Sequence, residues 1–407
     1  MWTSHKSIMR TLTLIFLAAC TTAFAQTYDT NNDVVQTFAG AGIPGYIDGQ
    51  GQSTEFSSAL GSIVADTAGN LYVWDGGNFR IRQINTNATV STLAGGGTQF
   101  EGSGTNVSFS LFSSGIGKMT IDHSNTIWMT ANFQGDTYLL SIQTNGYVSI
   151  ENGNLAGMST SSGLCFDSQN YLYYSGSYRI YRYNTISGVS QVFAGSGVSG
   201  HQDGNGVFSE FNSPSSLVCD QANNIYVQDG QLRKVDQSEN VTTITNSIAG
   251  NLMSVDNSGN ILLVNSSSEL IEKFTINTNV LIYAGTNYFG TGTTYSNGVA
   301  NVARFYNPSS ACFSQGSIFV TDTGNYRIRQ ISFNPQPQIV APANLGIGTY
   351  AGVTITGSIG RTYQIQSSPD LSTWTPAATL ILASSPYLWI DPSGAAGNKF
   401  YRALLLP

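Results

Sequence analysis

Charged side chains are scarce in this chain, since Asp, Glu, Lys and Arg together make up only 10% of its 407 residues. Lysine occurs five times, histidine three times and cysteine four times. The formal net charge is −7, whereas proteins that bind nucleic acid present a basic surface. No apolar run reaches the length that a membrane-spanning helix needs. We therefore expect neither nucleic acid as a partner nor a transmembrane helix.

The chain is rich instead in the residues of strands and turns. It contains 44 glycines, 21 tyrosines and 20 phenylalanines, and Asn, Ser and Thr are abundant. Aromatic residues and threonine favour strands, and Gly, Asn and Ser favour the turns between them. This composition predicts an all-β fold.

The first 25 residues have the features of an export signal. Basic residues precede an apolar run at 12–19, and small residues at 23 and 25 form a cleavage pattern. A second interpretation is a lipoprotein signal, because residues 17–20 resemble a lipobox in which Cys20 carries the lipid. Either signal predicts a secreted, extracellular or periplasmic protein, which is lipid-anchored if Cys20 is modified.

One unit recurs six times after this segment: an apolar strand, a polar turn, a second strand, a turn and a third strand. The clearest copy occupies residues 62–84, and a fourth strand follows it at 90–93. Repeats of this kind predict a propeller or a solenoid. A fourth strand at 34–38 precedes the first repeat, and none follows the last one. We therefore predict a six-bladed β-propeller over residues 26–333, closed by the N-terminal strand.

Five of the repeats place an aspartate directly after the first strand. The third residue beyond it is always Gly or Asn, which tolerate positive φ, and an aspartate that opens a turn accepts bonds from the next backbone N–H groups. We interpret these carboxylates as structural rather than catalytic. They are Asp66, Asp122, Asp167, Asp220 and Asp256.

The third strands alternate basic and apolar residues, as in Arg80–Ile84 and Arg327–Ile331. We interpret the basic residues as half-solvated groups near the outer edge of each blade, rather than as an anion site.

Three cysteines lie at matching places in different repeats, namely Cys165, Cys219 and Cys312. Equivalent strands of different blades are not expected to bring Cβ atoms within bridging distance. We therefore predict buried free thiols.

Several motifs recur on the loops between repeats. They are Asp-Gly-x-Gly at 48–51 and 203–206, Phe-x-x-Pro at 211–214 and 305–308, and Asp-x-Gly-Asn-x-Arg-Ile-Arg at 75–82 and 322–329. With these motifs the chain resembles NHL-repeat propellers over roughly three quarters of its length. It departs from them in the third and fifth repeats, whose preceding loops are short.

A Pro-containing linker at 334–343 separates a second segment, residues 344–407. Its five alternating runs predict a small β-sandwich. The run 360–374, together with 400–403, resembles modules that end many large secreted proteins of environmental bacteria, which implies a fibronectin- or immunoglobulin-like topology and a role in attachment or sorting. We expect Tyr363 and Trp374 in its core.

Ligands of propellers usually bind the face formed by the loops between blades. The long loops here are 42–56, 96–112, 197–211 and 286–305, which predicts a groove walled on one side and open over the third and fifth blades. Aromatic rings could stack on a ligand there and carboxylates could accept its hydroxyl groups, which suits a glycan, a peptide or a protein. The candidate ligand-binding residues are Tyr46, Asp48, Asp75, Phe100, His201, Asp203, Asp229, Tyr288, Phe289 and Asp322.

These features predict a monomeric, non-enzymatic binding module without a cofactor. The alternative is a divalent-metal lactonase or related hydrolase that resembles gluconolactonase, with Ca²⁺ held by Asp48 and Asp203 in the channel of the propeller. A histidine zinc site is not expected, because His123 and His201 are predicted on opposite faces. The two functions differ in whether carboxylates converge at the channel.

Overall fold

The computed structural model describes residues 28–112, 116–153, 155–256, 258–275, 280–286, 295–333, 352–358, 361–382, 386–391 and 399–406. The predicted signal segment and the linker at 334–343 lie outside these ranges. Within them, regular structure consists of antiparallel strands and of short 3₁₀ turns, which confirms the predicted all-β fold. The 3₁₀ turns are η1 (Gly51–Ser53), η2 (Gly76–Asn78), η3 (Gly104–Asn106), η4 (Phe109–Leu111), η5 (Gly206–Phe208) and η6 (Thr323–Asn325).

Six sheets of four or five strands form the larger part of the described protein, and we number them in chain order of their innermost strands. Sheet 1 contains β2 (Gly49–Gln50), β6 (Thr89–Ala94), β5 (Arg80–Ile84), β4 (Leu71–Asp75) and β3 (Leu60–Ala65), in spatial order. Sheet 2 contains β7 (Gly102–Ser103), β11 (Tyr147–Gly153), β10 (Asp136–Ile142), β9 (Ile127–Phe133) and β8 (Ile116–Ile121). Sheet 3 contains β15 (Val189–Ala194), β14 (Arg179–Asn184), β13 (Tyr171–Gly176) and β12 (Leu164–Phe166).

The other three sheets repeat this order. Sheet 4 contains β16 (Gly204–Asn205), β20 (Asn240–Thr245), β19 (Leu232–Val235), β18 (Ile225–Gln228) and β17 (Ser216–Cys219). Sheet 5 contains β24 (Val280–Ala284), β23 (Leu270–Phe274), β22 (Ile261–Asn265) and β21 (Asn251–Val255). Sheet 6 contains β25 (Gly298–Val299), β1 (Val34–Ala39), β28 (Arg327–Ser332), β27 (Ser317–Asp322) and β26 (Pro308–Ser314).

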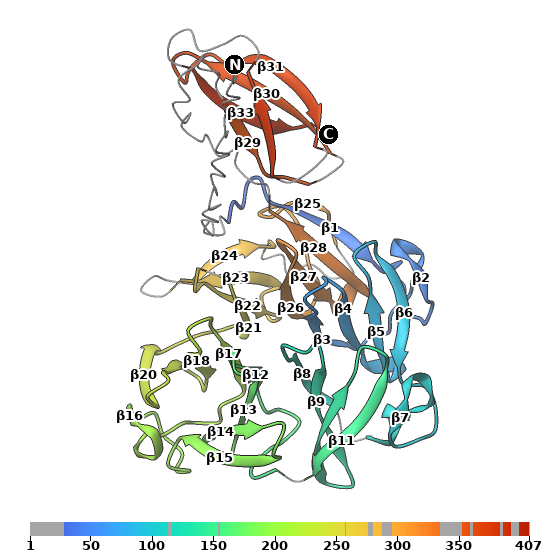
Figure 1. The fold of residues 1–407 in the computed structure, drawn as a ribbon, viewed down its shortest axis with the longest axis vertical. Coiled ribbons are helices and arrows are strands. Elements are labelled where there is room, and N and C mark those ends of the chain that lie inside the picture. The colour runs from blue at the N-terminus through green and yellow to red at the C-terminus, as the bar shows by residue number, and fades with distance from the viewer. Residues whose placement is uncertain are drawn as a thin grey trace, which may run out of the picture.

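The innermost strands form a closed ring. Strands β3, β8, β12, β17, β21 and β26 contact one another in this order, and β26 contacts β3. The sheets radiate from this ring as the blades of a propeller (Figure 1). An axial channel runs between the innermost strands.

The N-terminal strand closes the ring. Strand β1 pairs with β28, from Val34 opposite Ser332 to Ala39 opposite Ile328. The earliest described strand is thus the fourth strand of the last sheet, which confirms the predicted closure. Closure of this kind holds the first and last sheets together through a ladder of backbone hydrogen bonds.

The long loops before sheets 1, 2, 4 and 6 each contribute a fifth strand. Strands β2, β7, β16 and β25 pair with the fourth strand at the outer edge of the sheet. Sheets 3 and 5, whose preceding loops are short, have four strands. We expected the long loops to wall a groove, but this pairing lays part of each loop along an outer edge instead, because an unpaired edge strand offers free hydrogen-bonding groups.

The apolar core lies between the sheets. Six clusters of buried side chains each join two neighbouring sheets around the ring. At the junction of sheets 1 and 2, for example, Trp74 meets Phe109 edge to face with ring centroids 5.6 Å apart. Every sheet is therefore apolar on both faces, which fits the nearly continuous apolar runs of the second strands.

The aspartate turns join the sheets on the face opposite the long loops. Asp122 Oδ1 accepts bonds from the backbone N–H groups of Ser124 and Thr126, both at 2.8 Å. Asn125, at φ 64°, accepts a bond of 3.1 Å from the N–H of Thr67 in the preceding sheet. The same link recurs from His123 to Asn170 and from Ser168 to Asn223. The structural interpretation of these aspartates is confirmed.

Two small sheets occur in the described part of the C-terminal segment. One pairs β29 (Gly352–Ile355) with β32 (Tyr387–Ile390), and the other contains β31 (Thr375–Ile381), β30 (Thr362–Ser368) and β33 (Phe400–Leu405). Both contribute to one apolar cluster that contains Tyr363, as predicted. The prediction for Trp374 was wrong, since its ring lies outside this cluster and packs against the guanidinium of Arg402 at 4.4 Å. Trp389 packs against the cluster instead.

Candidate functional site

The long loops and the turns between second and third strands share one face, which we call the loop face. The N–H of Gly76 in the turn of sheet 1 donates to the carbonyl of Ala59 in the preceding loop at 2.8 Å. In sheet 6 the N–H of Gly324 donates to the carbonyl of Tyr306 at 2.8 Å. These bonds confirm the predicted placement of the loops.

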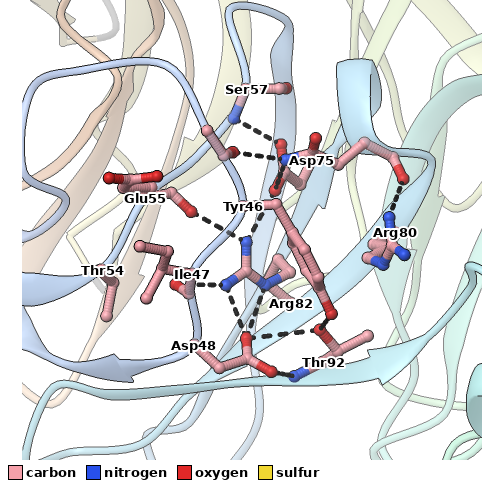
Figure 2. A network of polar contacts seen from close by, with 12 residues as sticks. Tyr46, Ile47, Asp48, Thr54, Glu55, Ser57, Asp75, Arg80, Arg82 and Thr92 are labelled. Atoms are coloured by element: carbon pink, nitrogen blue, oxygen red, sulfur yellow. Dashed lines mark hydrogen bonds and ion pairs between the residues drawn. The ribbon is translucent and has the colours of Figure 1, made fainter.

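A buried arginine holds the loop face together in sheet 1 (Figure 2). Arg82 is wholly buried and lies 2.8 Å from Asp75, which is also wholly buried, and 2.6 Å from Asp48, which is 41% exposed. Its guanidinium also donates to the carbonyls of Ile47 and Glu55, at 3.0 and 3.1 Å. The side chain of Arg82 thus connects both halves of the loop, at Ile47 and at Glu55, to Asp75 at the start of the turn.

The same arrangement occurs in sheet 4. Arg233 is wholly buried and lies 3.2 Å from Asp229 and 2.8 Å from Asp203. It donates to the carbonyls of Gln202 and Glu210, each at 3.1 Å. The loop before sheet 4 is therefore fastened in the same way.

Sheet 6 contains the third copy, with one substitution. Arg329 lies 2.8 Å from Asp322, and both side chains are wholly buried. It donates to the carbonyls of Ser296 and Arg304, both at 2.9 Å, and to the side-chain oxygen of Asn297 at 3.0 Å. Asn297 thus takes the place of the second aspartate.

The interpretation of the basic residues of the third strands as half-solvated holds for Arg80, Arg182 and Lys234, which are partly exposed. It was wrong for Arg82, Arg233 and Arg329, which are wholly buried. A β-bulge between the third and fourth strands adjoins the same position in all six sheets. The residues at this position are Arg82, Leu140, Tyr181, Arg233, Glu272 and Arg329. Arginine occupies it only where a long loop with an Asp-Gly or Asn-Gly pair covers the strand, because the loop supplies the oxygen atoms that the guanidinium needs.

The predicted acceptor carboxylates are therefore engaged within the protein. Asp75, Asp229 and Asp322 are buried beneath the loops. Asp48 and Asp203 bind arginine and the N–H of a residue on the fourth strand, in both cases at 3.0 Å. The structure does not bring Asp48 and Asp203 together, since their loops flank sheets 1 and 4 on opposite sides of the ring (Figure 1).

Hydrogen bonds keep the Asp203 carboxyl ionised. Burial raises its pKa, but bonds from the backbone and hydroxyl of Thr243 and from Arg233 outweigh that effect, and the pKa is lowered from its usual value. The ionised carboxylate holds the loop in place through its bonds to Arg233 and Thr243.

The aromatic residues that we predicted to stack on a ligand lie in different surroundings. Tyr46 is 42% exposed, but its ring lies over Arg80, with the guanidinium carbon 4.0 Å from the centroid. Phe100 belongs to an aromatic cluster with Phe112 and Phe133, at centroid distances of 5.0 and 4.7 Å, so its ring is not free to stack on a ligand. Tyr288 and Phe289 lie outside the described residues.

His201 lies on the loop face of sheet 4, in the position that Tyr46 has in sheet 1. Its side chain is 35% exposed, and Nδ1 is 3.5 Å from Asp229 Oδ2. His123 lies in an aspartate turn on the opposite face, as predicted. The two imidazoles do not meet.

The sequence analysis missed three aromatic residues at the ends of turns on the loop face. Phe79, Tyr178 and Tyr326 each directly precede a third strand, and they have left-handed backbone with φ of 53°, 61° and 56°. Bulky side chains rarely adopt this conformation. The signal that could have found them is an aromatic residue before the first arginine of the third strand, in Asn-Phe-Arg, Ser-Tyr-Arg and Asn-Tyr-Arg.

The axial channel is a concave feature apart from the loop face. It has a volume of about 350 Å³ and is lined by residues of all six innermost strands. No Asp, Glu or His is found among these lining residues, and no group of three or more His, Cys, Asp or Glu side chains within the described ranges could hold a metal ion.

All three predicted thiols lie in the channel wall and are free. No disulfide joins them, as expected, although two of the thiols are neighbours. Cys165 and Cys219, on the neighbouring strands β12 and β17, share a hydrogen bond. Burial, followed by this bond, raises the pKa of Cys165 well above its usual value.

Comparisons with known proteins support the fold. No protein-family model and no curated protein matches the chain. A structural genomics protein of unknown function from Bacteroides thetaiotaomicron is 18% identical, over 74% of this chain and 76% of that one, with a TM-score of 0.55. Virginiamycin B lyase from Staphylococcus aureus is 13% identical, over 68% of this chain and 95% of that one, with a TM-score of 0.46. A gluconolactonase from Xanthomonas campestris is 10% identical, over 74% and 89%, with a TM-score of 0.46.

The similarity to the first of these structures supports a propeller-like fold. It carries no information about activity. Among the described residues, no helix is long and apolar enough to cross a membrane.

Proposed function

We propose that the protein is an exported, six-bladed propeller of the NHL type that binds a glycan or a peptide at its loop face without catalysing a reaction. The observation that supports this function is the set of three strained aromatic residues, Phe79, Tyr178 and Tyr326, at the ends of the turns on that face.

The conformation of these residues is costly. A non-glycine residue in left-handed backbone costs roughly 1–2 kcal/mol, because Cβ crowds the following carbonyl. The corresponding residue of sheet 2 is Gly135, at φ 97°, so the fold accepts glycine at this point. Such strain persists where the surroundings enforce it, and it concentrates at functional sites.

The aromatic side chains are accessible. Phe79 is 41% exposed and Tyr178 is 38% exposed, and Tyr326 is partly exposed. Rigid aromatic rings on a surface provide large contact areas at low entropic cost, and they stack on the apolar faces of sugars and on peptide side chains. Tyr and Phe are therefore well suited to anchor such a ligand.

The buried arginines supply the rigidity in sheets 1 and 6, where Phe79 and Tyr326 lie. Asn78, which directly precedes Phe79, donates to Asp75 and to the carbonyl of Gly45, both at 2.8 Å. Asp75 is in turn held by Arg82. Residues held by such a network lose little entropy when they bind a ligand.

The metal-dependent hydrolase is less well supported. It requires carboxylates that converge on the channel, whereas Asp48 and Asp203 bind Arg82 and Arg233. The charges of those carboxylates are already compensated, so a divalent cation would have to displace a guanidinium.

Glycan and peptide arrays test the proposal, with the wild-type chain and the variants Phe79→Gly, Tyr178→Gly and Tyr326→Gly. Glycine adopts the left-handed backbone freely, so the turns keep their geometry. We expect each variant to keep its thermal stability and to lose between about fivefold and about 150-fold in affinity, as the loss of one stacking contact of about 1–3 kcal/mol implies.

Ala88→Gly is the matched control. Ala88 also has a left-handed backbone, at φ 62°, but it lies in a turn between third and fourth strands, next to the aspartate turns. This variant should bind as the wild type does. If the aromatic residues only packed the fold, their glycine variants would lose about 3 kcal/mol of stability and keep their affinity.

A further inference from the structure

The axial channel contains one feature that the loop face does not explain, an unpaired ammonium group. Among the described residues that line the channel, Lys118 on β8 alone has a side chain that is charged at neutral pH. None of the ion pairs found among the described residues includes it. Its protein partner is the hydroxyl of Ser216 on β17, to which Nζ donates.

Lys118 occupies a position where sheets 1 and 6 have serine. In sheet 1, Ser62 Oγ accepts a bond of 3.2 Å from the N–H of Met119 on the next innermost strand. In sheet 6, Ser310 Oγ accepts one of 3.3 Å from the N–H of Ile63. These hydroxyls join adjacent strands, a task that an ammonium group cannot perform because it has no acceptor.

The lysine reaches Ser216 across sheet 3, where the matching residue is Gly163. A Cβ at Gly163 would lie 2.6 Å from the backbone nitrogen of Leu217, so no side chain fits there. The ammonium group is thus held over a gap in the ring of side chains. It has three donor protons, and Ser216 uses one of them.

The electrostatics of this position favour an anion. Lys118 is partly exposed within the channel, and an ammonium group that is partly removed from water and lacks a counter-ion is unfavourable. A bound anion offsets this cost. Burial lowers the pKa of Lys118 to about 8, which still leaves most of the amine protonated at neutral pH. Two donor protons of the ammonium group remain for an oxyanion.

The rest of the channel combines aliphatic side chains with hydroxyl groups, such as those of Thr120 and Ser310, which suits a small organic molecule. Its wall includes Ile63, Met119, Leu217 and further aliphatic side chains. One wall hydroxyl is unpaired, since Ser254 Oγ is buried and has no hydrogen-bond partner among the described residues. A volume of about 350 Å³ lies within the range of small-molecule sites.

We propose that the axial channel is a binding site for a small organic carboxylate, whose carboxylate group pairs with Lys118 while its apolar body lies against the aliphatic wall. This site is separate from the loop face and does not depend on the function proposed for that face. A carboxylate fits better than an inorganic anion because the aliphatic side chains of the wall can contact its carbon body.

Calorimetric titration of the full chain with butyrate and benzoate, and with the neutral analogues butyramide and benzamide, tests the site. We expect saturable binding of the carboxylates and at least tenfold weaker binding of the amides. The variant Lys118→Met, which keeps the length of the side chain and removes the charge, should lose the preference for carboxylates. Lys234→Met is the control, because Lys234 lies on a third strand away from the channel, and it should leave the titration unchanged.

Thermal melting separates a loss of binding from a loss of stability in the variant. Removal of an uncompensated buried charge should leave Lys118→Met at least as stable as the wild type without ligand, and benzoate should raise the melting temperature of the wild type alone. Crystals soaked in 4-bromobenzoate should show bromine in the channel, with the carboxylate beside Lys118. The proposal is overturned if no carboxylate binds, or if Lys118→Met binds carboxylates as tightly as the wild type.

Discussion

The guanidinium of Arg82 and the carboxylate of Asp75 lie 2.8 Å apart, and neither side chain has any exposure to solvent. The partners are seven residues apart, on adjacent strands that a turn on the loop face connects. The spacing recurs in sheet 6 with Asp322 and Arg329. A buried ion pair is maintained only where further hydrogen bonds satisfy both ions, and here the long loop supplies them.

The variant Arg82→Met tests how much the fold depends on this pair. It leaves the Asp75 carboxylate buried without its cation and frees both arms of the loop, so we expect a loss of about 3–5 kcal/mol in the free energy of unfolding. Urea unfolding, followed by fluorescence, measures it.

Arg182→Met is the matched control for that variant. Arg182 also lies on a third strand, in sheet 3, but it is partly exposed and stacks on Tyr171. We expect this variant to lower the free energy of unfolding by less than about 1 kcal/mol. Equal losses in the two variants would show that the buried pair contributes no more than a surface arginine.

The architecture was predictable because it depends on local patterns. Turn residues such as Asp122 and Asn125 define the hairpins from their own neighbours, and alternation places the strands between them. The position of the fourth strand at 34–38, ahead of the first full repeat, was enough to infer ring closure. These features need no knowledge of contacts between distant residues.

The arginine network was not predictable in the same way. Alternation in Arg80–Ile84 shows that Arg82 faces away from Ile81, but not whether that side is covered. The cover comes from Asp48, 34 residues earlier in the chain, whose loop folds over the strand. The same limit applies to Phe79, because its sequence neighbours do not reveal that it occupies the left-handed position of the turn.

The links between aspartate turns can be tested at Asn125. Its side chain accepts a bond of 3.1 Å from Thr67 of the preceding sheet, and its φ is 64°. Asn125→Gly keeps the backbone but removes the bond, and we expect a loss of about 1 kcal/mol. Asn125→Ala also adds left-handed strain, for a total of about 2–3 kcal/mol. Thermal denaturation of both variants measures their order of stability, and we expect the glycine variant to be the more stable of the two. A glycine variant less stable than the alanine variant would contradict this prediction.

The channel thiols should resist modification in the folded protein. Burial raises the pKa of Cys312 to about 12 and that of Cys165 well above its usual value, so little reactive thiolate forms at pH 8. In a chain with Cys20→Ser, we expect Ellman's reagent to label Cys165 and Cys312 at least about a hundredfold more slowly than after unfolding in urea, with the partly exposed Cys219 faster. Rapid labelling of all three thiols in the native protein would show that the channel is open to the reagent.

Lys118 should make stability increase with pH. Its pKa is lowered to about 8 by burial in the folded protein, whereas an unfolded chain has the ordinary value near 10.5. Between these values the unfolded chain binds the proton and the folded protein does not, so the free energy of unfolding rises with pH, by up to about 3 kcal/mol.

The channel thiols oppose this trend, because burial raises the pKa values of Cys165 and Cys312 in the folded state. The quantity to measure is therefore the difference between wild type and Lys118→Met, in which the thiol contributions cancel. Urea unfolding at several pH values from 7 to 10.5, without added carboxylate, should show a difference that favours the variant below pH 8 and shrinks above it. If the difference does not vary with pH, the ammonium group is solvated in the folded protein and the premise of an unpaired charge in the channel is wrong.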